Sequence, residues 1–173
     1  RLMIIPARGN SKRIKNKNIR IFHGKPIIYY SIDSSIKSNL FSKIHISTDS
    51  MKIKNIVEKK GTNVDFLRPK KLSRDFTPLM DVFQYVVNEY SNQGLNYDEV
   101  WSLMPCSPLI DHNDLKRIAI FYNKQSLRKP LLSISKYKVP IQWAYEIKKK
   151  KPNKTNKYKV FKVKISRLAT SIF

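Results

Sequence analysis

The chain has few of the residues that build disulfide frameworks or thiolate metal centres. Among its 173 residues it contains one cysteine, Cys106, and three histidines, His23, His45 and His112. One cysteine excludes an internal disulfide and a zinc site built from several thiolates, and the histidines share no motif. No apolar run approaches the ~20 residues of a membrane-spanning helix, and no secretory signal pattern precedes the first apolar run. We therefore expect a cytoplasmic protein with no membrane partner.

Acidic residues are also scarce. The chain carries 12 Asp and Glu against 35 Lys and Arg, a formal net charge of +23. No acidic residue follows Glu146, and the ten Lys and Arg between Lys148 and Arg167 supply +10 of the charge. A charge of this size points first to nucleic acid. However, the basic segments lack interleaved aromatic residues and a recognised binding module. The abundance of Lys, Ile, Asn and Tyr is typical of A/T-rich coding, so we expect no nucleic-acid partner.

Strand-like and helix-like patterns alternate along the first 147 residues. Strands are predicted at 2–5, 43–48, 64–67, 99–104 and 131–135, and helices at 26–38, 51–60, 78–91 and 111–123. Strands separated by helices of about ten to fifteen residues indicate βαβ units. The sequence predicts an α/β fold over residues 1–147, a three-layer α/β/α sandwich with a mostly parallel sheet. The lysine-rich segment 148–173 is expected to form an edge strand or a disordered tail.

The loop after the first predicted strand has the composition of a polyphosphate-binding loop. No acidic residue precedes Asp33. Gly9 allows a ligand to approach the backbone closely, and free amides with fixed cations bind phosphate oxygens. Neither the Walker spacing nor G-x-G-x-x-G is present. Five basic residues fall within ten positions: Arg8, Lys12, Arg13, Lys15 and Lys17.

Four distinctive loops follow predicted strands. They span residues 6–18, 48–50, 68–77 and 104–110. In open parallel sheets, ligands bind beyond the carboxyl ends of the strands. The sequence therefore predicts that these loops form one site at one edge of one sheet.

Five collinear segments in these loops resemble the N-terminal two-thirds of the acylneuraminate (CMP-sialic acid) cytidylyltransferases. The match spans residues 2–110, with looser similarity to about Trp143, and Val139-Pro-Ile-Gln142 resembles the pseudaminic-acid branch. The segments are Ile5-Pro-Ala-Arg-Gly-Asn-Ser-Lys-Arg-Ile14 with Lys17-Asn18-Ile19 and Gly24-Lys25-Pro26, then Ser47-Thr48-Asp49, Leu67-Arg68-Pro69, Leu72-Ser-Arg-Asp-Phe-Thr-Pro78 and Pro105-Cys-Ser-Pro-Leu109.

The resemblance implies a Rossmann-like nucleotide-diphospho-sugar transferase fold. It also implies that CTP and a nine-carbon 2-keto (nonulosonic) acid of sialic, pseudaminic or legionaminic type give the CMP-sugar and pyrophosphate, for surface-glycan or lipopolysaccharide biosynthesis. Arg8, Lys12 and Lys17 are implied as catalytic, and Met104 and Ser107 as sugar-binding. Implied nucleotide contacts are Arg8, Gly9, Asn10, Ser11, Lys12, Lys17, Asn18, Arg68 and Thr77, with Arg68 reading the cytosine edge and Thr77 nearby.

Several of these residues have a structural alternative. Arg68 can be an ordinary surface arginine, and Thr77 is at least a helix cap. Thr48-Asp49 can be read as a metal or acid motif, but we expect Asp49 to cap the next helix and brace the first loop. Cys106 replaces the usual hydroxyl residue and receives no nucleophilic role. The remaining candidates, expected to be structural, are Asp81, Tyr29, Tyr30, Tyr85 and Tyr90.

The family implies Mg²⁺ held by an Asp-x-Asp segment, which this sequence lacks, so no metal ligand is assigned. A family homodimer is also implied, with its dimerisation element missing here. We expect residues 148–173 to be a truncated or diverged remainder of the domain, and the 173 residues to be inactive or nearly so. Two alternatives stay open: a nucleotide-binding remnant without catalysis, and a cytidylyltransferase for the eight-carbon acid of lipopolysaccharide cores. The Lys17-Asn18 match and the Leu-Ser-x-Asp-x-Thr-Pro segment stand against the second.

Overall fold

The computed structural model describes residues 1–11, 14–124, 129–134, 145–148 and 159–162. The chain divides into two compact units, Arg1–Arg128 and Lys129–Phe173. In the second unit, β6 (Tyr145–Lys148) pairs antiparallel with β7 (Lys159–Lys162). The boundary expected between residues 147 and 148 stays a prediction. None of the helices in the described ranges has the length and apolar composition needed to cross a bilayer.

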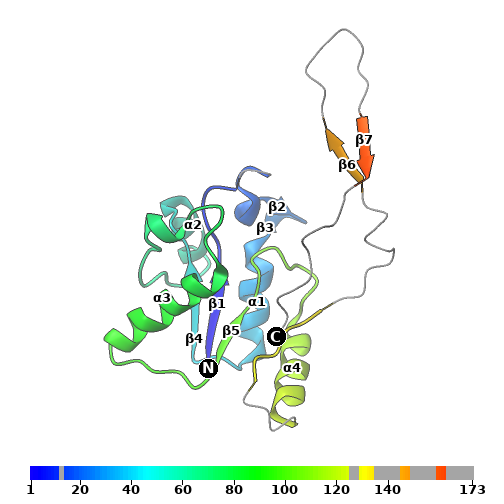
Figure 1. The fold of residues 1–173 in the computed structure, drawn as a ribbon. Coiled ribbons are helices and arrows are strands. Elements are labelled where there is room, and N and C mark those ends of the chain that lie inside the picture. Colours follow the sequence, from blue (N-terminus) through cyan, green and yellow to red (C-terminus); the bar gives the residue numbers. More distant parts are fainter. Residues whose placement is uncertain (12–13, 125–128, 135–144, 149–158, 163–173) are drawn as a thin grey trace. The chain divides into compact units, whose positions relative to one another are not determined.

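The first unit is built on a parallel sheet with β1 (Leu2–Pro6) in the middle (Figure 1). Its neighbours are β4 (Lys43–Ser47) and β5 (Val100–Ser102), in the order β4-β1-β5. All five residues of β1 are buried. A parallel strand that is covered on both faces needs such a continuous apolar run. The prediction of a central strand at 2–5 is confirmed.

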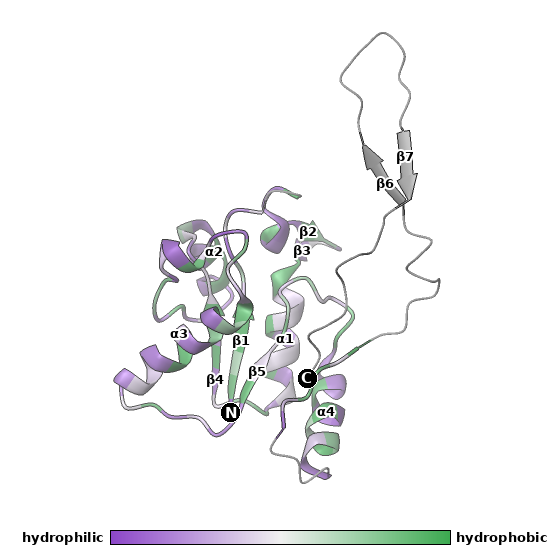
Figure 2. Ribbon diagram, in the orientation of Figure 1, coloured by the Kyte–Doolittle hydropathy of each residue, from purple (hydrophilic) through white to green (hydrophobic). Residues whose placement is uncertain are grey.

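The side chains of β1 alternate between two hydrophobic clusters. Met3 and Ile5 pack with residues of α1, α2 and α4, whereas Leu2 and Ile4 pack with residues of α3. Figure 2 shows the hydrophobic β1 between helices that each carry hydrophilic and hydrophobic residues. Helices on both faces confirm the three-layer α/β/α sandwich. The helices are α1 (Ile28–Ser38), α2 (Met51–Glu58), α3 (Leu79–Asn92) and α4 (His112–Lys124).

Two of the predicted strands are wrong. Residues 64–67 form no strand, because Val64 packs in one cluster and Phe66 in the other, so the apolar alternation reflects loop packing. Residues 131–134 form no strand either, and Ser135 lies outside the described residues. Pro26 does not begin a helix: β3 (Lys25–Pro26) pairs antiparallel with β2 (Ile21–Phe22). Short 3₁₀ turns span Lys17–Ile19 and Lys70–Leu72.

Two predicted helix caps are also wrong. The N-cap of α2 is Ser50, whose hydroxyl accepts from the Ile53 amide at 3.4 Å, so Asp49 does not cap this helix. Thr77 is not the cap of α3, because Pro78 stands at that position and makes no side-chain cap bond. The Thr77 amide instead donates to the Arg74 carbonyl at 3.3 Å and closes the preceding turn.

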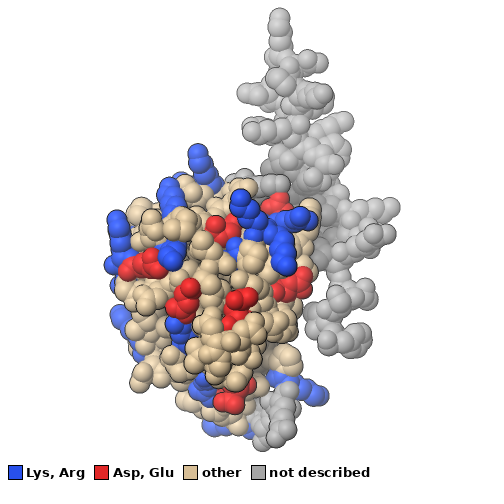
Figure 3. All heavy atoms as spheres, turned by 90° about the vertical axis from the view of Figure 1, so that its left-hand side faces the viewer, with Lys and Arg blue, Asp and Glu red and all other residues tan. Residues whose placement is uncertain are grey.

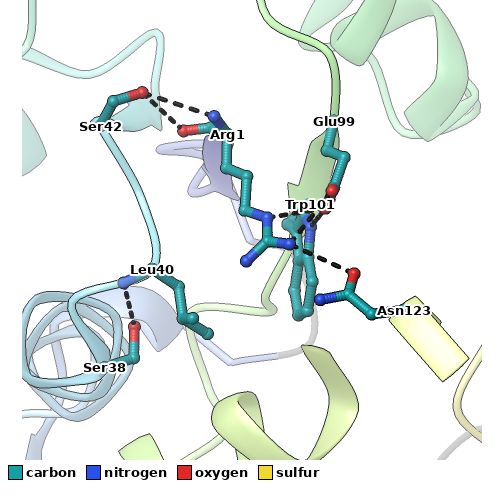
Figure 4. A network of polar contacts seen from close by, with 7 residues as sticks. All are labelled: Arg1, Ser38, Leu40, Ser42, Glu99, Trp101 and Asn123. Carbon is teal, nitrogen blue, oxygen red and sulfur yellow. Dashed lines mark hydrogen bonds and ion pairs between the residues drawn. The ribbon is translucent and has the colours of Figure 1, made fainter. Parts of the chain in front are cut away.

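A polar network joins the amino ends of β1 and β5 to the end of α4 (Figure 4). Arg1 donates to the Glu99 carboxylate at 2.9 and 3.2 Å and to Asn123 at 3.4 Å, and the Trp101 indole also donates to Glu99. Partial burial opposes ionisation of Glu99, but the bonds from Trp101 and Arg1 outweigh it and lower its pKa. These contacts fix the sheet at the edge opposite the four loops.

Candidate functional site

The four loops meet at the carboxyl edge of the sheet and are joined by direct contacts. Three of them follow β1, β4 and β5, and the fourth follows the irregular segment after α2. The predicted grouping of the loops is confirmed. The contacts that join them run from Gly9 to Asp49, from Arg8 to Asp75, from Arg68 to Ser47 and from Cys106 to Asn18.

The peptide bond between Arg8 and Gly9 is held at both polar ends. The Asn18 side chain donates from Nδ2 to the Arg8 carbonyl at 3.0 Å, and the Gly9 N–H donates to Oδ1 of Asp49 at 2.7 Å. Asn18 is only 4% exposed. The bracing role expected for Asp49 is confirmed. The two bonds fix the backbone from which the Arg8 side chain leaves, so the loop is organised before any ligand binds.

Gly9 is required by packing within the protein. A Cβ atom at this position would lie 2.6 Å from Cβ of Ser50 and 3.2 Å from its Oγ, closer than non-bonded atoms approach. The first loop therefore lies directly on the N-cap of α2, and only a residue without a side chain allows this contact.

Arg68 is buried, with 6% of its surface exposed, so the surface-arginine alternative is wrong. Its Nε donates to Ser47 Oγ at 3.1 Å and its Nη2 to the Ser47 carbonyl at 2.6 Å. Burial lowers the pKa of the guanidinium; Asp49 opposes this shift and Arg8 adds to it. Two guanidinium groups thus lie near enough at the edge of the sheet to repel each other, which favours an anionic ligand.

Arg8 forms an ion pair with Asp75 at 2.8 Å, and both side chains are about one-third exposed. The pair holds the segment after the second 3₁₀ turn beside the first loop. Because a guanidinium binds carboxylates and phosphates through the same N–H groups, Asp75 occupies a position that a phosphate could take.

Helix α1 anchors the loop after β5. Ser31 donates to the Met104 carbonyl at 2.8 Å, and Ser34 donates to the Ile110 carbonyl at 2.7 Å. Met104 is 43% exposed and Ser107 is half-buried, so both predicted sugar contacts lie on a loop with a fixed backbone.

The other predicted nucleotide contacts lie on the same loops. Asn10 and Lys17 are exposed, and Ser11 and Thr77 are half-buried. Lys12 lies outside the described residues. The roles assigned to these residues stay predictions.

No three side chains of His, Cys, Asp or Glu come together in the described part of the chain. Asp49 is bonded to Gly9 and Asp75 is paired with Arg8. This part of the chain alone does not fit a Mg²⁺ site.

The sheet, its covering helices and the loop edge define an α/β domain, and the chain belongs to the cytidylyltransferase family, whose model matches residues 2–164. The pseudaminic acid cytidylyltransferase of Campylobacter jejuni strain 81-176 is 38% identical over 146 residues, 83% of this chain and 62% of that relative. The CMP-N,N'-diacetyllegionaminic acid synthase of Legionella pneumophila is 27% identical over 146 residues, 84% of this chain and 62% of the relative. The chain thus spans about 62% of the length of these relatives.

A solved structure supports the fold. The structure of a CMP:2-keto-3-deoxy-manno-octonic acid synthetase complexed with CTP matches with a TM-score of 0.60 at 19% identity. The match covers 73% of this chain and 48% of that chain. At this identity the match bears on the architecture alone.

Sequence reasoning missed the residues that position the loops. Ser31 and Ser34 were assigned no role at the site, and Cys106 no nucleophilic role, yet each bonds to a site loop. A stripe of buried serines at helical spacing was the available signal: Ser31, Ser34, Ser35 and Ser38.

Proposed function

We propose that this chain binds CTP at the carboxyl edge of the sheet and forms the nucleotide-binding part of a cytidylyltransferase for a nonulosonic acid. The observation that carries the proposal is the pair of arginines, Arg8 and Arg68, held on joined loops beyond β1 and β4. The chain's relatives named above support the class of reaction.

The two arginines have separate proposed roles. Arg8, together with Lys17 and Lys12, binds the triphosphate. Arg68 reads the base: two of its five N–H groups are bonded to Ser47, and no other bond of this side chain occurs among the described residues. Cytosine presents two neighbouring acceptors, O2 and N3, to such a donor. Uracil has an N–H donor in place of N3, so it would lose one of the two bonds.

In the proposed reaction, the anomeric hydroxyl of the sugar acid gives its proton to solvent water, and its oxygen bonds to the α-phosphorus of CTP. The bond from that phosphorus to the bridging oxygen breaks, and pyrophosphate leaves. Positioning and stabilisation of charge on the phosphoryl oxygens dominate catalysis of such transfers. In this chain, Asn18 and Asp49 hold the Arg8–Gly9 peptide, so the guanidinium of Arg8 is a cation that is already oriented. Bound Mg²⁺ is proposed, as in the family, with carboxylates that the described residues do not supply.

The sugar acid is proposed to be of pseudaminic type. The Campylobacter relative named for that acid is 38% identical, against 27% for the legionaminic one. Met104, an apolar side chain 43% exposed at the loop after β5, suits the deoxy positions of such a sugar, with Ser107 as a polar contact. The eight-carbon octulosonate is the second candidate, and competition between the two acids would separate them.

Calorimetric titration with CTP of the 173-residue chain and its Arg8→Ala variant tests the proposal. Loss of a charged hydrogen-bond partner costs roughly 1.5–3 kcal/mol, so CTP should bind about tenfold or more weakly to the variant. Arg117→Ala is the matched control, because Arg117 also pairs with an aspartate, Asp114, but on α4. Equal loss in both variants would mean that only net charge matters.

A further inference from the structure

Cys106 connects the loop after β5 to the loop after β1. Its thiol donates to Oδ1 of Asn18 at 3.4 Å and lies 3.9 Å from the Lys17 carbonyl oxygen. Burial raises the pKa of the thiol, and Lys17 acts in the opposite direction. The sulfur therefore keeps its hydrogen at neutral pH and remains a donor.

The Asn18 carboxamide has a contact at each end. Its Oδ1 accepts from Cys106, and its Nδ2 donates to the Arg8 carbonyl at 3.0 Å. An amide that accepts at one end and donates at the other is held in one of its two orientations. Because Asn18 is 4% exposed, water cannot readily replace the thiol at Oδ1. The orientation that serves Arg8 thus depends on the donor from Cys106.

The backbone on each side of Cys106 is fixed independently. Ser31 and Ser34 of α1 hold the carbonyls of Met104 and Ile110 at 2.8 and 2.7 Å. Cys106 therefore extends from an anchored loop toward the first loop, and the first loop is the part that is positioned.

We propose that Cys106 is a positioning residue which, through Asn18, holds the Arg8–Gly9 peptide and so directs the Arg8 guanidinium toward the nucleotide phosphates. The inference rests on the proposed function, because it assumes that Arg8 binds phosphate. It assigns Cys106 an effect on binding of the β- and γ-phosphates of CTP and none on the part of the nucleotide that CMP retains, a distinction that a purely structural role would not make.

The test compares the affinities of CTP and CMP for Cys106→Ala and Cys106→Ser by calorimetry. Removal of one neutral hydrogen bond should weaken CTP about two- to tenfold in Cys106→Ala, and CMP by less than twofold. Cys106→Ser keeps a donor and should bind CTP within twofold of the unmodified chain. Cys106→Val, which fills the space without a donor, should behave as Cys106→Ala does and replaces it if the alanine variant does not fold.

A double-mutant cycle locates the effect. If Cys106 acts through Asn18, the variant with both Cys106→Ala and Asn18→Ala should bind CTP no more weakly than Asn18→Ala alone. Ser91→Ala is the control, because Ser91 also donates to an asparagine oxygen, that of Asn96 at 3.1 Å, at the far end of α3. It should leave CTP binding unchanged and should not couple to Cys106.

Three results would overturn the inference. Cys106→Ala and Cys106→Val could both bind CTP as the unmodified chain does, the CTP and CMP affinities could fall equally, or the Cys106 and Asn18 effects could simply add. If the unmodified chain itself does not bind CTP, the proposed function fails, and this inference fails with it.

Discussion

At the scale of single residues, the first loop depends on contacts with the protein as much as on its charges. The Arg8–Gly9 peptide is bonded to Asn18 and Asp49, and Gly9 leaves no room for a side chain against Ser50. A loop whose backbone is fixed in this way loses little conformational freedom when a ligand binds.

Gly9→Ala should destabilise the fold by about 1–3 kcal/mol, because its Cβ atom would lie 2.6 Å from Cβ of Ser50. Adding Ser50→Gly removes the opposing atom and should restore most of the loss, since glycine is only a few tenths of a kcal/mol worse than serine as an N-cap. Adding Ser50→Ala keeps the Cβ atom and should not rescue. Urea unfolding measures all variants, and equal behaviour of the two double variants would contradict the steric explanation.

The loops that carry the candidate residues could be predicted from the sequence, but the partners of those residues could not. The motif placed Arg68 and Cys106 on loops at the right edge. It did not reveal that Arg68 donates to Ser47 or that Cys106 donates to Asn18, because these partners are 21 and 88 residues away in the chain. Such pairings depend on strand order and helix packing, which local patterns do not specify.

At the scale of elements, a polar chain that includes the buried His45 and Tyr90 joins β4 to α3. The Tyr90 hydroxyl donates to Asp65 at 2.6 Å, so its oxygen accepts from Nδ1 of His45 at 3.0 Å. Lys43 forms an ion pair with Asp65 at 2.5 Å. Burial lowers the pKa of His45 to about 4, with Asp65 opposing the shift and Lys43 and Arg68 adding to it. The network is stable only with a neutral His45.

The stability of the domain should fall as the pH decreases from 6.5 toward 4. In this interval the unfolded chain binds a proton at His45 and the folded chain does not, so the loss reaches on the order of 3 kcal/mol near pH 4. His45→Phe keeps the ring and leaves Tyr90 bonded to Asp65, and should flatten the dependence. His112→Gln, on α4, is the control.

Urea unfolding at several pH values measures this effect. Measurements above pH 4.5 show most of the change in unfolding free energy that His45 causes. Burial opposes ionisation of Asp65, but the bonds from Lys43 and Tyr90 outweigh it and lower the pKa of that carboxyl. The Asp65 ion pair is therefore lost only at lower pH. Parallel curves for the unmodified chain and His45→Phe would refute the role of His45.

The continuous apolar run of the first strand and the periodic helices were predicted correctly, whereas two short segments were wrongly predicted as strands. Leu2–Ile5 was predicted because a strand covered on both faces needs a continuous apolar run, and the helices because packing against a sheet imposes a clear period. The apolar residues at 64–67 resembled a strand, but they belong to a loop whose Val64 and Phe66 pack in two different clusters. At 131–134 the apolar side chains of Leu131, Leu132 and Ile134 are exposed. The N-cap of α3 is Pro78, one residue after Thr77, which the sequence predicted as the cap.

At the scale of the whole molecule, the net charge of +23 does not take the form of a uniformly basic surface. The face shown in Figure 3 carries acidic side chains among the basic ones. Several lysines and arginines of the first unit are paired, as Lys25 and Lys60 are with Asp33. Burial opposes ionisation of Asp33, but the bonds from these lysines outweigh it and lower its pKa.

The 173 residues expressed on their own should bind CTP but release pyrophosphate slowly or not at all. The sequence has no Asp-x-Asp segment, and hard cations need carboxylates placed with the phosphates. Adding ~1–10 mM Mg²⁺ should not change this, whereas fusion to the C-terminal segment of the Campylobacter relative should restore turnover. Rapid CTP-dependent pyrophosphate release by the short chain with a nonulosonic acid would show that the metal argument is wrong and would direct attention to Asp49.

The central claim is that the joined loops at the carboxyl edge bind a cytosine nucleotide. Calorimetric titration of the unmodified 173-residue chain with CTP and with UTP, under identical salt and pH, tests it most directly. Because uracil loses one bond to a charged donor at Arg68, CTP should bind about tenfold or more tightly than UTP. Equal affinities for the two nucleotides would contradict base reading by Arg68, and no binding of either would contradict the site itself.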